Sequence, residues 1–229
     1  MSEHDNIDQA KQKRLERERT QRREAIISVA EDIFAKQGYS EAMVDEIATE
    51  AGYTKATIYN YFDSKDDLYI AVATRAFDKL IEIMDKTLSQ PDAVYELRSL
   101  GNAYLTFVEE CPFYAEIMDS GRLSIAFNAI VEKERTSQPL TECEQELRSR
   151  QLRIERLMTD VIAQTLMNSG VQEKVDPLSV TIALSTLGLA IREIIMRGKT
   201  GGVPEEKTRE YLSVLYTIID QGLKHYDAK

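Results

Sequence analysis

The segment from Arg22 to Gly52 constrains the fold most, because apolar residues recur in it at helical spacing and glycine interrupts the pattern twice. The first apolar stripe begins at Ile26 and stops before Gly38, which predicts a helix over about residues 22–37. The second stripe begins at Val44 and stops at Gly52. Glycine often follows the last turn of a helix, since it adopts positive φ without strain. The pattern therefore predicts two consecutive helices.

Two further helices are expected directly after this pair. Thr54 is a good N-cap residue, and Ile58 and Phe62 lie four positions apart, so they share one face of a short third helix. Ser64 is the next candidate N-cap, and the helix that it begins is expected to continue to about Leu88. Four helices are therefore predicted in the first 88 residues.

Proline and glycine divide the rest of the chain into helical patterns. We expect helices over about residues 92–110, 112–119, 123–137, 141–168, 177–197 and 204–226. An apolar content of 43% in 229 residues is enough for a sizeable core, and only five prolines and ten glycines interrupt it. The predicted fold class is all-α.

Composition also excludes several kinds of protein. No apolar run approaches the roughly 18 to 20 residues of a membrane span, and the N-terminus lacks the apolar core of a secretory signal. We therefore expect a cytoplasmic protein with no membrane partner. Cys111 and Cys143 are too few for a disulfide framework or a zinc site, and no phosphate-binding glycine motif occurs, so neither a metal nor a cofactor is expected.

The net charge of −10 is distributed unevenly. Residues 11–65 hold ten basic and ten acidic side chains, whereas residues 66–229 hold 19 basic and 26 acidic ones. A nucleic-acid contact in the N-terminal part is therefore compatible with the charge. Lys11 to Arg23 form a basic arm or helix extension, for which DNA contact and simple solvation are equally supported, since Glu16 and Glu18 interrupt the cations.

The second and third predicted helices have the features of a helix-turn-helix. Such a motif needs a small residue where its helices touch, glycine in the turn, and a branched apolar residue in the second helix. Ala48, Gly52 and Ile58 supply these three features in the required order. The motif places DNA binding among the possible functions.

The flanking residues make the pattern more specific. The landmarks are Phe34, Gly38-Tyr39, Ile47-Ala48, Ala51-Gly52, Thr54-Lys55, Ile58-Tyr59, Tyr61-Phe62 and Ser64-Lys65. Over residues 22 to about 80, the sequence resembles the DNA-binding domain of the TetR family of prokaryotic regulators. The resemblance implies a homodimeric, usually repressing regulator with a C-terminal domain that binds an inducer and dimerises.

The same resemblance implies a set of DNA-binding residues at the start of the third helix and just after it. They are Thr54, Lys55, Ala56, Thr57, Tyr59, Asn60, Tyr61 and Lys65. Of these, Lys55, Ala56 and Thr57 would face base edges, and the tyrosines, Asn60 and Lys65 would approach phosphates. Lysine can reach guanine acceptors, and threonine offers a hydroxyl or a methyl contact. The family often has Ser or Thr before the second helix, where this chain has Ala42-Met43, so we expect no hydroxyl contact to a DNA phosphate there.

The C-terminal part carries no ligand motif, but it holds two sets of candidate residues. The first set consists of aromatic and methionine side chains, which we expect either to pack in the core or to line a ligand cavity. They are Tyr104, Phe107, Phe113, Tyr114, Met118, Phe127 and Met158. The candidate dimer interface consists of two stripes on the last two helices, which form a four-helix bundle with their symmetry mates or pack only on their own subunit. One stripe has the small and branched residues Ala183, Leu187, Ala190 and Ile194, and the other has Leu212, Leu215, Tyr216 and Ile219.

These expectations define three segments: a basic, partly flexible arm over residues 1–21, a helix-turn-helix domain over 22–82, and a larger helical effector-binding and dimerisation domain over 83–229. The predicted function is a homodimeric repressor released from a palindromic operator in double-stranded DNA by a small hydrophobic effector. The alternative is an effector-independent, DNA-organising or protein-binding regulator of the same fold. An enzyme is disfavoured, because the two histidines are near the chain ends and no catalytic motif occurs.

Overall fold

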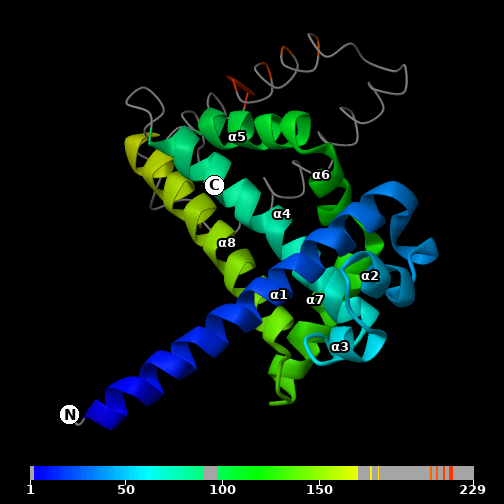
Figure 1. Ribbon diagram of the computed structural model, residues 1–229. Coiled ribbons are helices and arrows are strands. Elements are labelled where there is room, and N and C mark those ends of the chain that lie inside the picture. Colours follow the sequence, from blue (N-terminus) through cyan, green and yellow to red (C-terminus); the bar gives the residue numbers. More distant parts are fainter. Residues whose placement is uncertain are drawn as a thin grey trace. The chain divides into compact units, whose positions relative to one another are not determined.

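The structure is a computed structural model that describes residues 3–89 and 97–169, together with seven separate positions: Asp176, Val180, Lys207, Glu210, Val214, Thr217 and Ile218. Over residues 3–89 and 97–169 the chain forms eight α-helices and no strand (Figure 1). The predicted all-α fold is confirmed. None of the helices in the described part of the chain is long and apolar enough to cross a membrane.

Apart from α1, the helices of the described part of the chain lie close to their predicted ranges. The helices are α1 (Glu3–Glu41), α2 (Val44–Glu50), α3 (Lys55–Tyr59), α4 (Lys65–Leu88), α5 (Leu97–Glu110), α6 (Pro112–Met118), α7 (Gly121–Arg135) and α8 (Glu142–Ser169). Local signals account for several boundaries: Ser64 Oγ accepts a hydrogen bond from the Asp67 backbone N–H at 3.0 Å, as expected of the N-cap of α4. Pro112 occupies the first turn of α6, where its missing N–H costs nothing.

Helix α1 differs most from the prediction, because it begins at Glu3 rather than near Arg22. Of the two alternatives for the N-terminal segment, arm or helix extension, the structure has the helix extension. An ion pair between Arg14 Nε and Glu18 Oε1 at 3.0 Å, one helical turn apart, supports this stretch. The predicted stop at Gly38 is visible as a break in the helix, where φ is 78° and ψ is 167°, a combination open essentially to glycine alone.

The contacts divide the chain into two compact units. Unit 1 consists of residues 1–74 and 126–147, and unit 2 consists of residues 75–125 and 148–229. Unit 1 thus contains α1, α2, α3 and the first part of α4, and it also takes in the end of α7 and the start of α8. The sequence analysis placed residues 126–147 in the second of its two globular domains.

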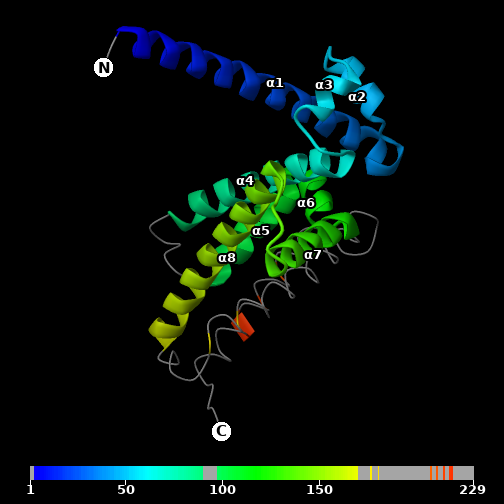
Figure 2. The same cartoon turned by 90° about the horizontal axis from the view of Figure 1, so that it is seen from below.

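Unit 1 is built around α2, α3 and the C-terminal part of α1, which lie side by side in both views (Figures 1 and 2). Its core is formed by apolar side chains that are at most 3% exposed: Ile26, Ile27, Ala30, Ile33, Phe34, Ile47, Ala48, Ile58, Phe62, Leu68 and Leu147. The three predicted helix-turn-helix landmarks agree with this core, since Ala48 and Ile58 are buried and Gly52 has a φ of 74°.

Unit 2 contains the rest of α4, α5, α6, the start of α7 and the rest of α8. Its buried side chains include Phe77, Leu80, Ala103, Phe107, Val108, Ile117, Val161 and Leu166. Two ion pairs join α8 to α4 within this unit: Arg150 Nε lies 2.9 Å from Asp78 Oδ1, and Arg153 Nη2 lies 2.6 Å from Asp85 Oδ2. The side chains of both pairs are at least one-third exposed, so the pairs add little to the stability of the unit.

The predicted dimer-interface residues lie outside the described residues. They are Ala183, Leu187, Ala190, Ile194, Leu212, Leu215, Tyr216 and Ile219. The two helices expected over residues 177–197 and 204–226 lie there as well, apart from separate positions.

Candidate nucleic-acid interface

The turn between α2 and α3 has a geometry that follows from its sequence. The Tyr53 N–H donates to the Ala48 carbonyl at 2.8 Å, and the Gly52 N–H donates to the Thr49 carbonyl at 3.1 Å. These two bonds form a Schellman motif, which requires positive φ at its central residue, here Gly52 with 74°. The turn therefore ends α2 sharply and lets α3 begin three residues later.

Thr54 begins α3 as predicted. Its Oγ1 accepts a hydrogen bond from the Thr57 backbone N–H at 3.2 Å and lies 2.9 Å from Thr57 Oγ1. The cap satisfies one of the free N–H groups at the helix start. Thr54 thus has a structural role, and the hydroxyl of Thr57 is oriented by it.

Lys55 and Ala56, at the start of α3, are exposed. Lys55 Nζ donates to Asp45 Oδ2 of α2 at 2.7 Å, and this hydrogen bond raises the pKa of the lysine. Both side chains are about half exposed, so the pair contributes little to stability. The pair connects the start of α3 to the first turn of α2.

The aromatic residues at the end of α3 separate into exposed and buried ones. Tyr59 is 44% exposed, whereas Phe62 is 1% exposed and belongs to the core. Tyr61 is half-buried, with its ring centroid 6.5 Å from that of Phe62, and Asn60 is exposed. Phe62, which shares a helix face with Ile58, thus lies in the core, and Tyr59 lies on the surface. Contact of these residues with DNA stays a prediction.

Lys65, at the first position of α4, packs on Tyr39 just beyond the helix break. Its Nζ lies 4.2 Å from the centroid of the Tyr39 ring, a cation–π contact. The Tyr39 hydroxyl in turn donates to Asp66 Oδ1 at 2.9 Å. The eight predicted DNA-binding residues therefore lie on one continuous stretch of unit 1, from the cap of α3 to the start of α4.

The start of α2 has no side-chain cap. Its N-cap residue is Met43, which makes no side-chain capping bond and is 61% exposed. Glu46, three residues later, is the type of residue that completes a capping box when the N-cap is serine or threonine. Its carboxylate accepts a bond from Gln37 Nε2 at 2.7 Å.

We therefore expect Met43→Ser to raise the free energy of unfolding by roughly 0.5 to 1 kcal/mol, because the new hydroxyl can accept a bond from the start of α2. Urea unfolding followed by circular dichroism measures the change. The matched control is Met43→Ala, which removes the same exposed side chain without adding an acceptor. If the two variants had equal stability, the uncapped start of α2 would not be a weak point.

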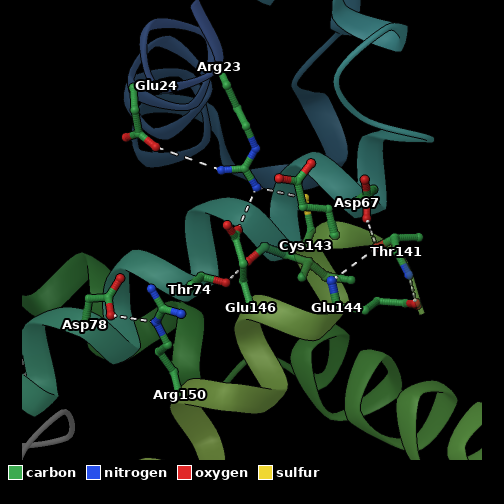
Figure 3. A network of polar contacts seen from close by, with 12 residues as sticks. Arg23, Glu24, Asp67, Thr74, Asp78, Thr141, Cys143, Glu144, Glu146 and Arg150 are labelled. Atoms are coloured by element: carbon green, nitrogen blue, oxygen red, sulfur yellow. Dashed lines mark hydrogen bonds and ion pairs between the residues drawn. The ribbon is translucent and has the colours of Figure 1, made fainter. Parts of the chain in front are cut away.

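A polar network lies behind this surface, inside unit 1 (Figure 3). Arg23 of α1 has a side chain that is only 12% exposed, and its Nη2 lies 2.6 Å from Glu146 Oε2 of α8. The guanidinium lies over the ring of Phe62, 5.5 Å from its centroid, and Nη2 is 3.4 Å from Cys143 Sγ. Burial raises the pKa of the Cys143 thiol to about 12, so it stays protonated at neutral pH and is no reactive thiolate.

The second half of the network joins α4 to the start of α8. The Thr141 hydroxyl donates to Asp67 Oδ1 at 2.6 Å, and it also accepts from the Glu144 N–H at 3.1 Å. The Glu144 carboxylate in turn accepts a hydrogen bond from the Thr141 N–H at 2.9 Å, and these two reciprocal bonds form a capping box. Lys133 of α7 donates to both oxygens of Glu144, at 2.7 and 2.8 Å. This network was not predicted, although Thr141-x-x-Glu144 has the residue types and spacing of a capping box.

The candidate ligand residues do not all lie in one unit. Tyr104 and Phe107 of α5 have ring centroids 6.4 Å apart, and Phe113 and Tyr114 of α6 have ring centroids 5.9 Å apart. Phe107 is fully buried. Together with Met118 and Met158 these residues belong to unit 2, whereas Phe127 belongs to unit 1. Their role as a ligand site stays a prediction.

Comparison with protein families matches residues 26–72 to the model of "Bacterial regulatory proteins, tetR family". Among curated proteins, the chain is 36% identical over 92 residues to the HTH-type transcriptional activator FasR of Mycolicibacterium smegmatis, a match that covers 40% of this chain and 42% of FasR. It is 36% identical over 72 residues to the HTH-type transcriptional repressor BepR of Brucella suis, covering 31% and 34% of the two chains. The chain thus spans less than half the length of these curated relatives.

A solved structure extends the similarity to most of the chain. The transcriptional regulator FadR from Bacillus subtilis, described in complex with stearoyl-CoA, superposes with a TM-score of 0.54 at 17% identity, and the match covers 88% of this chain and 97% of FadR. At this identity the likeness shows a common fold. The three proteins are named as transcription regulators, in agreement with the prediction of a non-enzymatic protein.

Proposed function

We infer that this chain, as a member of the TetR family of bacterial transcription regulators, acts as a homodimer that represses transcription from a palindromic operator until a small hydrophobic ligand releases it. The observation that carries the DNA-binding part is the surface of α3, where Lys55, Ala56, Tyr59 and Asn60 are exposed beside a capped and well-packed helix start. A short helix presented in this way can enter the major groove.

The proposed release depends on spacing. Two recognition helices of a dimer must meet half-sites about 34 to 36 Å apart, one turn of the duplex, so a shift of a few ångströms prevents simultaneous docking. Helix α4 is continuous from Lys65, one of the predicted DNA-binding residues, to Leu88 in unit 2. A ligand bound in unit 2 could change the spacing through α4. For almost complete release, the ligand must bind the released state of the protein about 10⁴-fold more tightly than the DNA-bound state, a difference of about 5.5 kcal/mol.

The ligand class proposed is a hydrophobic acyl compound. The aromatic side chains of α5 and α6 support an apolar ligand, and FadR, which shares the fold, is described with stearoyl-CoA. Of the two curated relatives, FasR is named an activator and BepR a repressor, and repression is the direction that we propose.

Selection from random duplexes, followed by footprinting, tests the operator. We expect a preferred palindrome of two half-sites, bound by a dimer in light scattering.

The ligand is tested by adding stearoyl-CoA to the protein–operator complex, with coenzyme A as the control. We expect stearoyl-CoA alone to raise the melting temperature of the protein and to release the DNA. Transcription in a reconstituted system should rise on release. Stabilisation by stearoyl-CoA without any loss of operator affinity would favour the effector-independent alternative.

A further inference from the structure

Basic and acidic side chains are distributed unevenly between two segments of unit 1, and the proposed function does not explain this distribution. Residues 24–65, which contain the helix-turn-helix, hold three basic and eight acidic side chains, whereas residues 11–23 hold seven basic and two acidic ones. Of the three lysines in the former segment, Lys36 and Lys55 face carboxylates of Glu50 and Asp45, at 4.0 and 2.7 Å. A surface so acidic attracts a polyanion poorly by itself.

The N-terminal part of α1 carries the positive charge that residues 24–65 lack, and its side chains are exposed. Both views show it leaving the rest of unit 1 (Figures 1 and 2). From Gln9 to Arg22 every side chain is exposed except Glu18, which is half-buried. Arg14 pairs with Glu18 and Arg19 approaches Glu142 at 3.7 Å. Among the described side chains, Lys11, Lys13 and Arg17 make no ion pair.

We propose that this helix extension, defined as residues 9–22, is a second DNA-binding element that lies along the phosphate backbone beside the segment bound by α3. The proposal rests on the proposed function, since it presupposes a DNA-bound protein. Its cations point in several directions: at 3.6 residues per turn, Lys11, Arg19 and Arg17 lie at about 0°, 80° and 240° around the helix axis. A helix charged on all sides can meet phosphates of both strands, as the basic helices of other DNA-binding proteins do.

Other occupants fit the helix extension less well. An anionic membrane surface would also attract its cations, but a helix that lies on a membrane needs a broad apolar face. Residues 9–22 contain only Ala10 and Leu15 as apolar residues, and Leu15 is 55% exposed. A protein partner would need similar apolar anchors. Binding to the phosphates of duplex DNA requires only the positive charge of the helix extension.

The test is the salt dependence of operator binding by the full chain. The variant K11Q/K13Q/R17Q keeps good helix formers but removes three cations from the helix extension. We expect its slope of log K against log salt to be smaller by about 0.9 for each lost phosphate contact, up to about 2.7 per chain, and its affinity at ~100 mM salt to be at least about tenfold weaker. The matched control is K86Q/R98Q/R156Q, which removes three exposed cations from unit 2 and should bind within about twofold of the unchanged protein.

The outcomes separate this proposal from the proposed function. An unchanged slope in K11Q/K13Q/R17Q, with operator preference intact in the unchanged protein, would overturn the proposal alone. Absence of any preferred DNA site in the unchanged protein would overturn the operator function, whereas a slope that still depends on the three cations would support the helix extension as a DNA contact. Co-sedimentation with phosphatidylserine vesicles that needs the three cations, without a change in DNA binding, would replace DNA by a membrane and overturn the proposal.

Discussion

Replacing Lys55 and Thr57 together by alanine is expected to weaken binding to the preferred operator by on the order of 10²-fold or more, because each base contact contributes about 1 to 3 kcal/mol. Affinity for random duplex DNA should fall much less, since phosphate contacts dominate it. The variant should stay folded: the Thr57 N–H that Thr54 Oγ1 caps is a backbone group, which alanine retains. Gel-shift titrations with operator and with random duplex measure the two affinities.

Two further variants test whether the effect on operator binding is specific to the base contacts. Tyr59→Phe removes only an exposed hydroxyl and should weaken all DNA sites alike, as loss of a phosphate contact would. Asp45→Asn removes the charge that holds Lys55 and should keep the preference for the operator. If Lys55, Thr57 and Tyr59 could all be replaced by alanine without loss of operator binding, α3 would not be the recognition helix.

The second large effect is expected inside unit 1. Glu146→Leu should lower the free energy of unfolding by about 2 to 3 kcal/mol, because it removes the short ion pair of the largely buried Arg23 guanidinium and leaves Glu24, 3.9 Å away, as the nearest carboxylate. The Nε atom of Arg23 already has no hydrogen-bond partner within the described part of the chain, and the thiol of Cys143, 3.4 Å from Nη2, carries no charge to replace that of Glu146. The estimate is below that for a fully buried pair, since the Glu146 side chain is 33% exposed. Urea unfolding measures the loss.

Glu132→Leu is the matched control, since Glu132 also belongs to unit 1 and pairs with Arg135 at 2.7 Å, but both of these side chains are more than half exposed. It should cost no more than about 1 kcal/mol. The double variant Arg23→Met with Glu146→Leu removes both charges and should recover much of the stability. Equal losses for Glu146→Leu and Glu132→Leu would show that the Arg23 pair is no stronger than a surface one.

Local sequence was sufficient to predict the helices of the N-terminal part and the turn between α2 and α3. The interactions that decide them join residues at most five positions apart, such as the bond from the Tyr53 N–H to the Ala48 carbonyl and the cap of Thr54 on Thr57. Residue type encodes such interactions directly: glycine permits the positive φ at position 52, and threonine supplies the cap. The candidate DNA-binding residues, in contrast, were assigned by the resemblance to the TetR family, and their contact with DNA stays a prediction.

Residue type left open how far the first helix extends, since charged residues without an apolar stripe suit a solvated helix and an arm equally. The structure continues α1 back to Glu3. Only that structure shows that the cations before Arg22 belong to a helix with no packed face, which is the basis of the second DNA contact proposed here.

The sequence by itself determined the all-α fold, the helix-turn-helix and the landmark residues of its core, because helical period, caps and turn glycines act over a few residues. Only the tertiary structure decided the partners of Arg23 and Asp67. The sequence analysis counted Arg23 in a basic run, yet it pairs with Glu146, 123 residues away, and Asp67 accepts a bond from Thr141, 74 residues away. Such pairs depend on which helix faces pack together, and packing is decided by the whole set of apolar surfaces that the chain must bury.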